Sequence, residues 1–157
     1  MRKIGLIAGT FDPPTLGHVN IIQRASSLTD QLIIAVIRNP EKKTHFSIDE
    51  RFEMLNILLP AAEITPFDGL LTDFARKKKV TFLIRGLRNF IDFEHEYQMA
   101  TANKKLSGIE TLFLMADEKY AQISSTLIKE IARVGGSLQN FIPQKIEPFI
   151  RKKLEKL

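Results

Sequence analysis

Three short segments, far apart in the sequence, combine residue types that suit the binding of a phosphate. The first, residues 9–18 (GTFDPPTLGH), joins a short apolar run to a helical pattern. Gly9 lets backbone approach a ligand closely, and Thr10 offers a hydroxyl and an N–H to an anion. Gly17 and His18 fall at the helix start, where free N–H groups and the dipole favour phosphate. A lone histidine could merely cap or pack the helix, but the helix start and the glycines favour a hydrogen bond to phosphate.

The second segment, residues 83–96 (LIRGLRNFIDFEHE), places two arginines three positions apart at the end of a predicted strand. Arg85 and Arg88 flank Gly86, which suits charge-assisted hydrogen bonds to phosphate oxygens. Three acidic residues follow between positions 92 and 96. Taken alone, this pattern favours two surface ion pairs instead.

The third segment, residues 120–130 (YAQISSTLIKE), has clustered hydroxyls that open a predicted helix. Hydroxyls together with free helix N–H groups form a cradle for an anion. Taken alone, however, the pattern favours ordinary N-capping, which Ser124 or Ser125 could perform by itself.

A lysine pair, Lys42 and Lys43, follows the second predicted strand. A lysine at this place can act as a point charge on a transferring phosphate. On the residues alone, either lysine could equally be a solvated part of the loop.

These segments resemble the motifs of a known enzyme family. Residues 15–18 (TLGH) resemble the T/H-x-G-H signature of the nucleotidyltransferase superfamily, which is related to class I aminoacyl-tRNA synthetases. The longer string 9–18 is similar to the start of bacterial phosphopantetheine adenylyltransferases. Residues 85–96 resemble that family's R-G-L-R…D-F-E-x-E block, and residues 123–126 its I-S-S-[ST] motif. The motifs occur in the family's order, and the resemblance runs from Lys3 to about Pro143.

The resemblance implies reversible transfer of an adenylyl group from ATP to 4′-phosphopantetheine, which gives dephospho-CoA and pyrophosphate, with Mg²⁺ as cofactor and no protein cage for the metal. It implies that catalysis rests on His18, Thr10 and Lys42, the last favoured over Lys43. The residues that the resemblance assigns to phosphopantetheine binding are Thr10, Lys42, Leu71 and Arg85, although Leu71 could equally be a core residue. It assigns to ATP Thr10, Phe11, His18, Gly86, Leu87, Arg88, Glu96, Tyr120, Ala121, Gln122, Ile123, Ser124, Ser125 and Thr126.

The resemblance also implies a homohexamer and feedback binding of coenzyme A. Three positions depart from the family pattern: Ala8 replaces a frequent proline, Leu16 a frequent asparagine, and Tyr120 a common tryptophan. None of these changes removes a charged or hydrogen-bonding group that the chemistry needs.

The elements that would position these segments alternate along the chain. Continuous apolar runs predict strands at 3–8, 32–37, 62–67, 80–84 and 110–115. Apolar residues at helical spacing predict helices that begin at residue 17 and that span 47–59, 70–78, 93–106, 124–134 and 143–157. The alternation predicts a single α/β domain over residues 1–157, with a Rossmann-like parallel sheet of about five strands and helices on both faces. Ligands then bind at the carboxyl ends of the strands.

Composition narrows the class of protein. The 157 residues are 44% hydrophobic and include no cysteine, which excludes disulfides and thiolate chemistry. No run approaches the roughly 18 apolar residues of a membrane span, and we expect a cytoplasmic protein without a membrane partner. The net charge of +5 favours anionic partners.

Two alternatives remain beside the adenylyltransferase hypothesis. Another small nucleotidyltransferase, for cytidylyl transfer or for nicotinamide mononucleotide, would share the first and third motifs, but the 85–96 block favours the phosphopantetheine family. A basic nucleic-acid-binding module is disfavoured because the chain has two tyrosines and no tryptophan for base stacking, so we expect no nucleic acid as partner.

Overall fold

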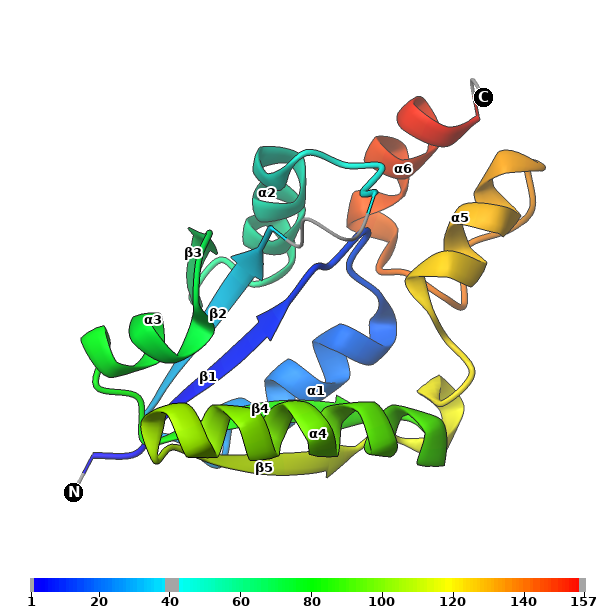
Figure 1. Cartoon of the computed structure of the whole chain (residues 1–157). Coiled ribbons are helices and arrows are strands. Elements are labelled where there is room, and N and C mark those ends of the chain that lie inside the picture. Colours follow the sequence, from blue (N-terminus) through cyan, green and yellow to red (C-terminus); the bar gives the residue numbers. More distant parts are fainter. Residues whose placement is uncertain (1, 39–42, 156–157) are drawn as a thin grey trace.

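The computed structural model describes residues 2–38 and 43–155, which form a parallel sheet covered by helices (Figure 1). In chain order the elements are β1 (Ile4–Gly9), α1 (Leu16–Ser26), β2 (Gln31–Ile37), α2 (Ile48–Leu58), β3 (Glu63–Phe67), α3 (Leu71–Lys77), β4 (Phe82–Leu87), α4 (Phe90–Ser107), β5 (Glu110–Met115), the 3-10 turn η1 (Glu118–Tyr120), α5 (Ser125–Arg133), the 3-10 turn η2 (Gln144–Ile146) and α6 (Glu147–Leu154).

The sheet has five strands in the order β3-β2-β1-β4-β5, and every neighbouring pair is parallel. β1 is therefore the central strand, with β2 and β3 added on one side of it and then β4 and β5 on the other. The crevice between the carboxyl ends of β1 and β4 is the switch point of such a sheet, where ligands bind. The predicted five-stranded α/β fold is confirmed.

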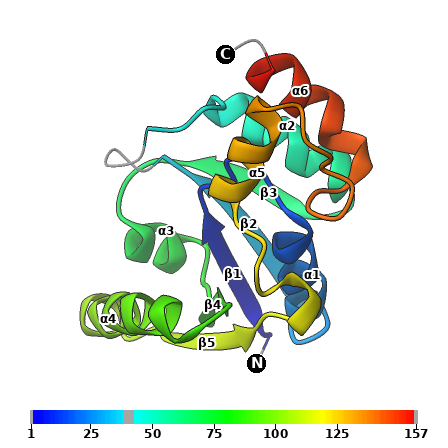
Figure 2. The ribbon, with the colours of Figure 1, turned by 90° about the vertical axis from the view of Figure 1, so that its right-hand side faces the viewer.

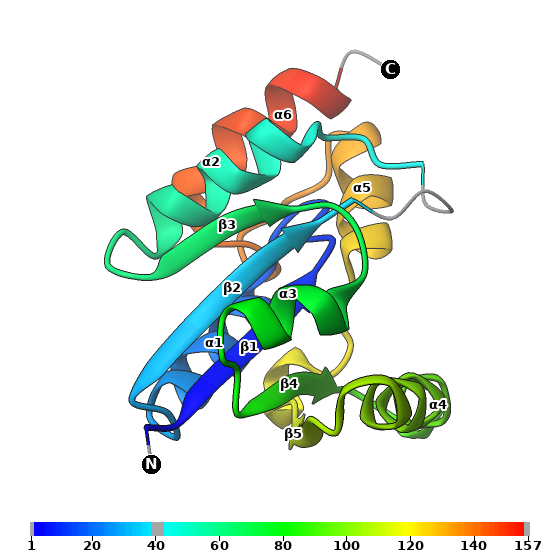
Figure 3. The same cartoon turned by 60° about the vertical axis from the view of Figure 1, so that its left-hand side comes forward.

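Alternating residues of the strands face two different layers of helices. One face of β1 packs Ile7 against α1 and α2, and the other packs Leu6 against α3. Figure 3 shows α3 in front of β1 and β2, with α1 behind them. Helices therefore cover both faces of the sheet, as predicted.

A third cluster of buried side chains joins α2 to the C-terminal elements. It contains Met54 of α2, Ile128 of α5, Ile146 of η2, and Ile150 and Leu154 of α6. Figure 2 shows α5 beside the end of β1, with α6 and α2 next to it. This cluster fixes the start of α5 near the carboxyl end of the sheet.

Three predicted boundaries were wrong. β4 runs on through Arg85 and Gly86 to Leu87, beyond the predicted end at residue 84. α4 begins at Phe90 rather than 93, because the side chain of Asn89 caps it by accepting a hydrogen bond from the Asp92 N–H. The predicted helix 143–157 is divided into η2 and α6.

No helix within residues 2–38 and 43–155 combines the length and the apolar character needed to cross a membrane.

Candidate active site

The loop after β1 is built around the ring of Phe11. This residue has a left-handed backbone (φ +51) and a buried side chain. Its ring lies so close to Gly9 that a Cβ there would come within 2.9 Å of it, which explains the glycine. The ring also packs edge-on against the imidazole of His18, with 5.0 Å between ring centroids. Phe11 thus fixes one side of the histidine.

His18 is the third residue of α1 and takes part in its N-terminal cap. The Thr15 hydroxyl accepts a hydrogen bond from the His18 N–H, and His18 Nδ1 accepts one from the Thr15 N–H, both at 3.1 Å. The alternative that His18 caps the helix is therefore correct for Nδ1. Because Nδ1 accepts, the neutral ring must carry its proton on Nε2, which makes no hydrogen bond to any other described residue.

The charge state of His18 follows from its surroundings. Burial lowers its pKa to about 4, and the positive charges of Arg88 and Arg85 act in the same direction. His18 is therefore neutral at pH 7 and can offer a phosphate oxygen its Nε2–H.

Arg85 lies near the end of β4 and is held from two sides. Its Nε and Nη2 donate to the two carboxylate oxygens of Glu96 at 2.6 and 2.7 Å, and its Nη1 donates to the carbonyl of Ala8 in β1. One N–H on each terminal nitrogen is left for a ligand. Arg85 and Glu96, which the resemblance assigned to different substrates, are thus a single bidentate pair.

Arg88 joins the second and third segments. Its Nε and Nη2 donate to Asp92 at 2.9 and 3.0 Å, and its Nη1 donates to the carbonyl of Ile123 at 3.2 Å. The expected alternative of ion pairs with the nearby acidic residues is therefore present for both arginines. It does not exclude phosphate binding, because Arg88 also keeps one N–H on each terminal nitrogen.

The third segment meets the first at the start of α5. Ser124 caps this helix by accepting the Leu127 N–H, so the capping alternative is correct for this residue. The hydroxyl of Ser125 instead donates to the carbonyl of Pro13 at 2.8 Å. A Cβ on Gly17 would lie 3.7 Å from the Tyr120 Cβ, so η1 lies against the start of α1. The three predicted segments therefore converge.

The other predicted residues that the structure describes lie in β4, in the stretch after η1, at the start of α5 and at the start of α3. Gly86 and Leu87 lie in β4. Ala121 follows η1, and the side chains of Gln122 and Thr126 are exposed. Leu71 is the first residue of α3 and packs on the cluster that contains Leu6. Lys42 lies outside the described residues.

Sequence reasoning missed a buried aspartate in the first segment. Asp12 accepts hydrogen bonds from the backbone N–H of Phe46 at 2.9 Å and of His45 at 3.1 Å, and forms an ion pair with Lys129 of α5 at 3.0 Å. Burial opposes its ionisation, but these N–H groups and the ammonium lower its pKa below the ordinary value. Asp12 therefore joins the loops after β1 and β2 to α5.

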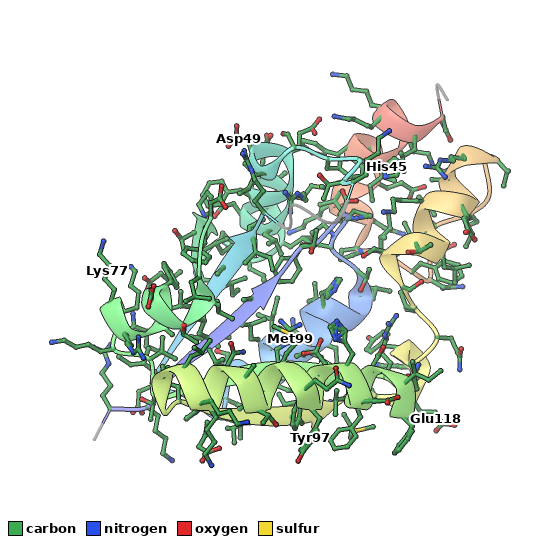
Figure 4. The ribbon with its side chains drawn as sticks, viewed as in Figure 1. His45, Asp49, Lys77, Tyr97, Met99 and Glu118 are labelled. Carbon is green, nitrogen blue, oxygen red and sulfur yellow. The ribbon has the colours of Figure 1, made fainter. Side chains whose placement is uncertain are left out.

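Two further basic residues near the junction were also missed. Arg133 of α5 contacts the Nε2 atom of His45, which lies in the loop before α2 (Figure 4). Arg51 of α2 is buried and binds the carbonyls of Thr10 and Ile37. The only available signal for these residues was their type, because the contacts of Arg51 with Thr10 and Ile37 and that of Arg133 with His45 join residues 14 to 88 positions apart.

The sheet thus carries a concentration of anion-binding groups at its switch point. The Cytidylyltransferase-like family matches residues 6–131. A phosphopantetheine adenylyltransferase of Caldanaerobacter subterraneus subsp. tengcongensis is 45% identical over 158 residues, with 98% of this chain and 99% of the relative covered. One of Clostridium botulinum is 46% identical over 156 residues, covering 97% and 95%.

Solved structures agree on the fold. A candidate nicotinate-nucleotide adenylyltransferase from Vibrio parahaemolyticus superposes with a TM-score of 0.65 at 17% identity over 98% of both chains. A lipopolysaccharide core biosynthesis protein from Thermoplasma volcanium gives 0.55 at 20% identity, over 74% of this chain and 98% of the other. With the full-length relatives, these findings place the chain in the phosphopantetheine adenylyltransferase family of nucleotidyltransferases.

Proposed function

We propose that the chain transfers AMP from ATP to the phosphate of 4′-phosphopantetheine and releases pyrophosphate and dephospho-CoA. The observation that carries the proposal is the junction of the three segments, in which Arg88 binds the Ile123 carbonyl and Ser125 binds that of Pro13. The near full-length relatives bearing this enzyme's name support the choice of acceptor.

The chemical step joins two anions, so alignment and charge stabilisation carry most of the rate. The phosphate of phosphopantetheine attacks the α-phosphorus of ATP in line, a P–O bond forms, and the bond to pyrophosphate breaks. His18 donates its Nε2–H to an oxygen of the pentacovalent centre, and Thr10 holds the attacking and transferring phosphates. The predicted contribution of Lys42 remains part of this proposal.

The departing pyrophosphate takes the negative charge of the broken bond. Arg88 offers its remaining N–H groups to it, and the start of α5 offers hydroxyls and free N–H groups from Ser124 to Thr126. The nucleoside end of ATP lies against Gly86 and Leu87 and the stretch 120–122. Tyr120 is the part of this surface that departs from the family pattern.

In this proposal Arg85 and Leu71 bind 4′-phosphopantetheine. Arg85 offers positive charge to one part of this substrate, and Leu71 offers an apolar contact to another part. Glu96 holds Arg85 by two hydrogen bonds. The predicted contact of Glu96 with ATP is kept as a proposal, and it requires a carboxylate lone pair that Arg85 leaves free.

In this proposal Mg²⁺ binds together with the triphosphate of ATP. Among residues 2–38 and 43–155, no three His, Asp or Glu side chains gather as a metal site, and Asp12 is bound by Lys129. The residues therefore do not fit a protein-held metal. Mg²⁺ commonly keeps its waters and binds substrate phosphates, so no step of the mechanism is assigned to a metal held by the chain.

The homohexamer that the resemblance implies is kept as a proposal, and an apolar surface on α4 and β5 supports association between copies of the chain. This surface includes Phe90, Ile91, Tyr97, Met99 and Met115, each about half exposed or more. Tyr97 projects from the outer side of α4 in Figure 4. A patch of this kind marks an interaction surface. Feedback binding of coenzyme A, which contains the product, and a cytoplasmic location belong to the same proposal.

The test is a pyrophosphate-release assay on the purified protein with ATP and Mg²⁺. Parallel reactions contain 4′-phosphopantetheine, nicotinamide mononucleotide, or glycerol 3-phosphate with CTP in place of ATP. We expect release with 4′-phosphopantetheine alone and its loss in His18→Ala. Release only with another acceptor would contradict the proposal, and steeply salt-dependent binding of nucleic acid without any release would favour the binding module.

A further inference from the structure

Arg51 is a buried cation that the proposed mechanism does not use. Arg51 is only 2% exposed, although it lies on the amphipathic helix α2. Its Nε donates to the carbonyls of Phe46 and Ser47 at 3.1 and 3.2 Å. Its Nη1 donates to the carbonyls of Thr10 at 2.6 Å and Ile37 at 3.0 Å. One guanidinium thus connects the ends of β1 and β2 with the start of α2.

The balance of charge around Arg51 is unusual for a buried residue. It forms no ion pair within the described ranges, and its partners are neutral carbonyls. Burial lowers its pKa, the negative charge of Asp12 opposes that shift, and Arg38 adds to it. An arginine stays protonated in such a setting. A positive charge is therefore fixed beneath the strand ends where the triphosphate is proposed to bind.

The hydrogen bond to Thr10 also sets the direction of the next amide. The peptide unit between Thr10 and Phe11 is planar and trans, so its C=O and N–H point in opposite directions. Because the carbonyl points inward to Arg51, the Phe11 N–H points away from the buried guanidinium. This N–H donates to no other described residue, and it follows Thr10 in the loop that also carries His18.

We propose that Arg51 is a positioning residue for adenylyl transfer, which holds the Thr10 carbonyl so that the Phe11 N–H donates to a phosphate oxygen of ATP. This inference rests on the proposed function. Arginine suits the role because its planar fork serves several carbonyls at once, and the single nitrogen of lysine cannot reproduce that geometry.

The test uses Arg51→Lys and Arg51→Gln in the full chain. Arg151→Lys is the matched control, because Arg151 also binds a backbone carbonyl, that of Gly136, away from the site. We expect folded Arg51→Lys to lose about 100-fold in kcat, with the KM for ATP nearly unchanged, since a displacement of about 1 Å misaligns the phosphates. Arg151→Lys should keep the wild-type kcat, whatever its melting temperature.

A second readout does not depend on turnover. In the wild type, the backbone NMR signal of Phe11 should shift when ATP is added, and in Arg51→Lys this shift should be lost. Wild-type kcat and the wild-type shift in a folded Arg51 variant would overturn the proposal, as would failure of both variants to fold, which would assign Arg51 to the fold alone. An inactive wild type would instead overturn the proposed function itself.

Discussion

The two sides of the site are held in place by different kinds of contact. On the β1–α1 side, backbone carbonyls, a neutral imidazole and the buried Arg51 are joined by hydrogen bonds within the protein. On the β4–α4 side, Arg85 and Arg88 are partly exposed and are held by the carboxylates of α4. The first side is fixed before any ligand arrives, whereas the second combines positioned charges with access to solvent.

This difference suggests a division of labour. Groups that must face the transferring phosphorus need fixed geometry, and the β1–α1 side supplies it. Groups that must attract a highly charged ligand need accessible charge, and the β4–α4 side supplies that. Changes on the first side should therefore lower turnover, and changes on the second should weaken binding.

The largest expected effect is that of His18→Ala. The substitution removes the Nε2–H that we place on the pentacovalent centre, so kcat should fall by roughly 100- to 1000-fold. The KM for ATP should change much less, because the contact strengthens only as charge develops. Steady-state kinetics with both substrates measures this split.

The matched control for this change is His95→Ala, on the exposed side of α4. It should leave kcat unchanged. A raised KM for ATP with wild-type kcat in His18→Ala would mean that His18 binds only ground-state substrate, and the proposed division would then fail.

Arg88→Ala should affect binding more than turnover. It removes charge-assisted hydrogen bonds to the pyrophosphate portion of ATP and the link to the Ile123 carbonyl. Loss of such bonds, at about 1.5–3 kcal/mol, corresponds to a rise in the KM for ATP of roughly 10- to 100-fold. Calorimetric titration with a non-hydrolysable ATP analogue would check it, and unchanged affinity would place the triphosphate elsewhere.

Glu96→Gln should have a smaller effect, on the other substrate. It weakens the pair that holds Arg85, which is partly exposed, so a loss of about 1 kcal/mol is expected. The KM for 4′-phosphopantetheine should then rise by about fivefold. Glu94→Gln, two residues away in α4 and exposed, is the control. A larger rise in the KM for ATP would instead support a direct contact of Glu96 with ATP.

The last prediction concerns stability in acid instead of catalysis. The pKa of folded His18, about 4, lies below its ordinary value of 6.5, so the unfolded chain binds the proton more readily. The free energy of unfolding should therefore fall as the pH drops from 6.5 to 4, and His18→Gln should make that slope shallower, while His45, whose pKa burial also lowers, keeps part of it. Asp12 should lower the free energy of unfolding further below pH 3.8, because its pKa is lower in the folded chain than in the unfolded chain. Urea unfolding across this range tests both, and an identical slope in the variant would contradict the assignment.

The sequence was sufficient for the parts of the fold that have local signals. The apolar runs of β1 and β2 predicted these two strands, because the residues of each run are neighbours in the chain. The predicted strand at 80–84 ended before Gly86, which lies within β4. Its missing side chain serves packing, since a Cβ there would lie 3.0 Å from Ile21 of α1.

The sequence predicted the site residues that belong to a motif. It did not predict the residues whose roles depend on partners far away in the chain. The three segments were found from their residue types. Asp12 and Arg51 were not, because their roles depend on residues 14 to 117 positions away and on burial that no local pattern reveals. Arg51 lies on a helix whose other polar residues face solvent, so sequence alone gave no reason to separate it from them.

The most direct test of the account is a crystal structure with α,β-methylene ATP bound. The account predicts the α-phosphate at hydrogen-bond distance, about 3 Å, from His18 Nε2, with the terminal phosphates between Arg88 and the start of α5. A triphosphate bound away from the junction, or with His18 against the adenine instead of the α-phosphate, would contradict it.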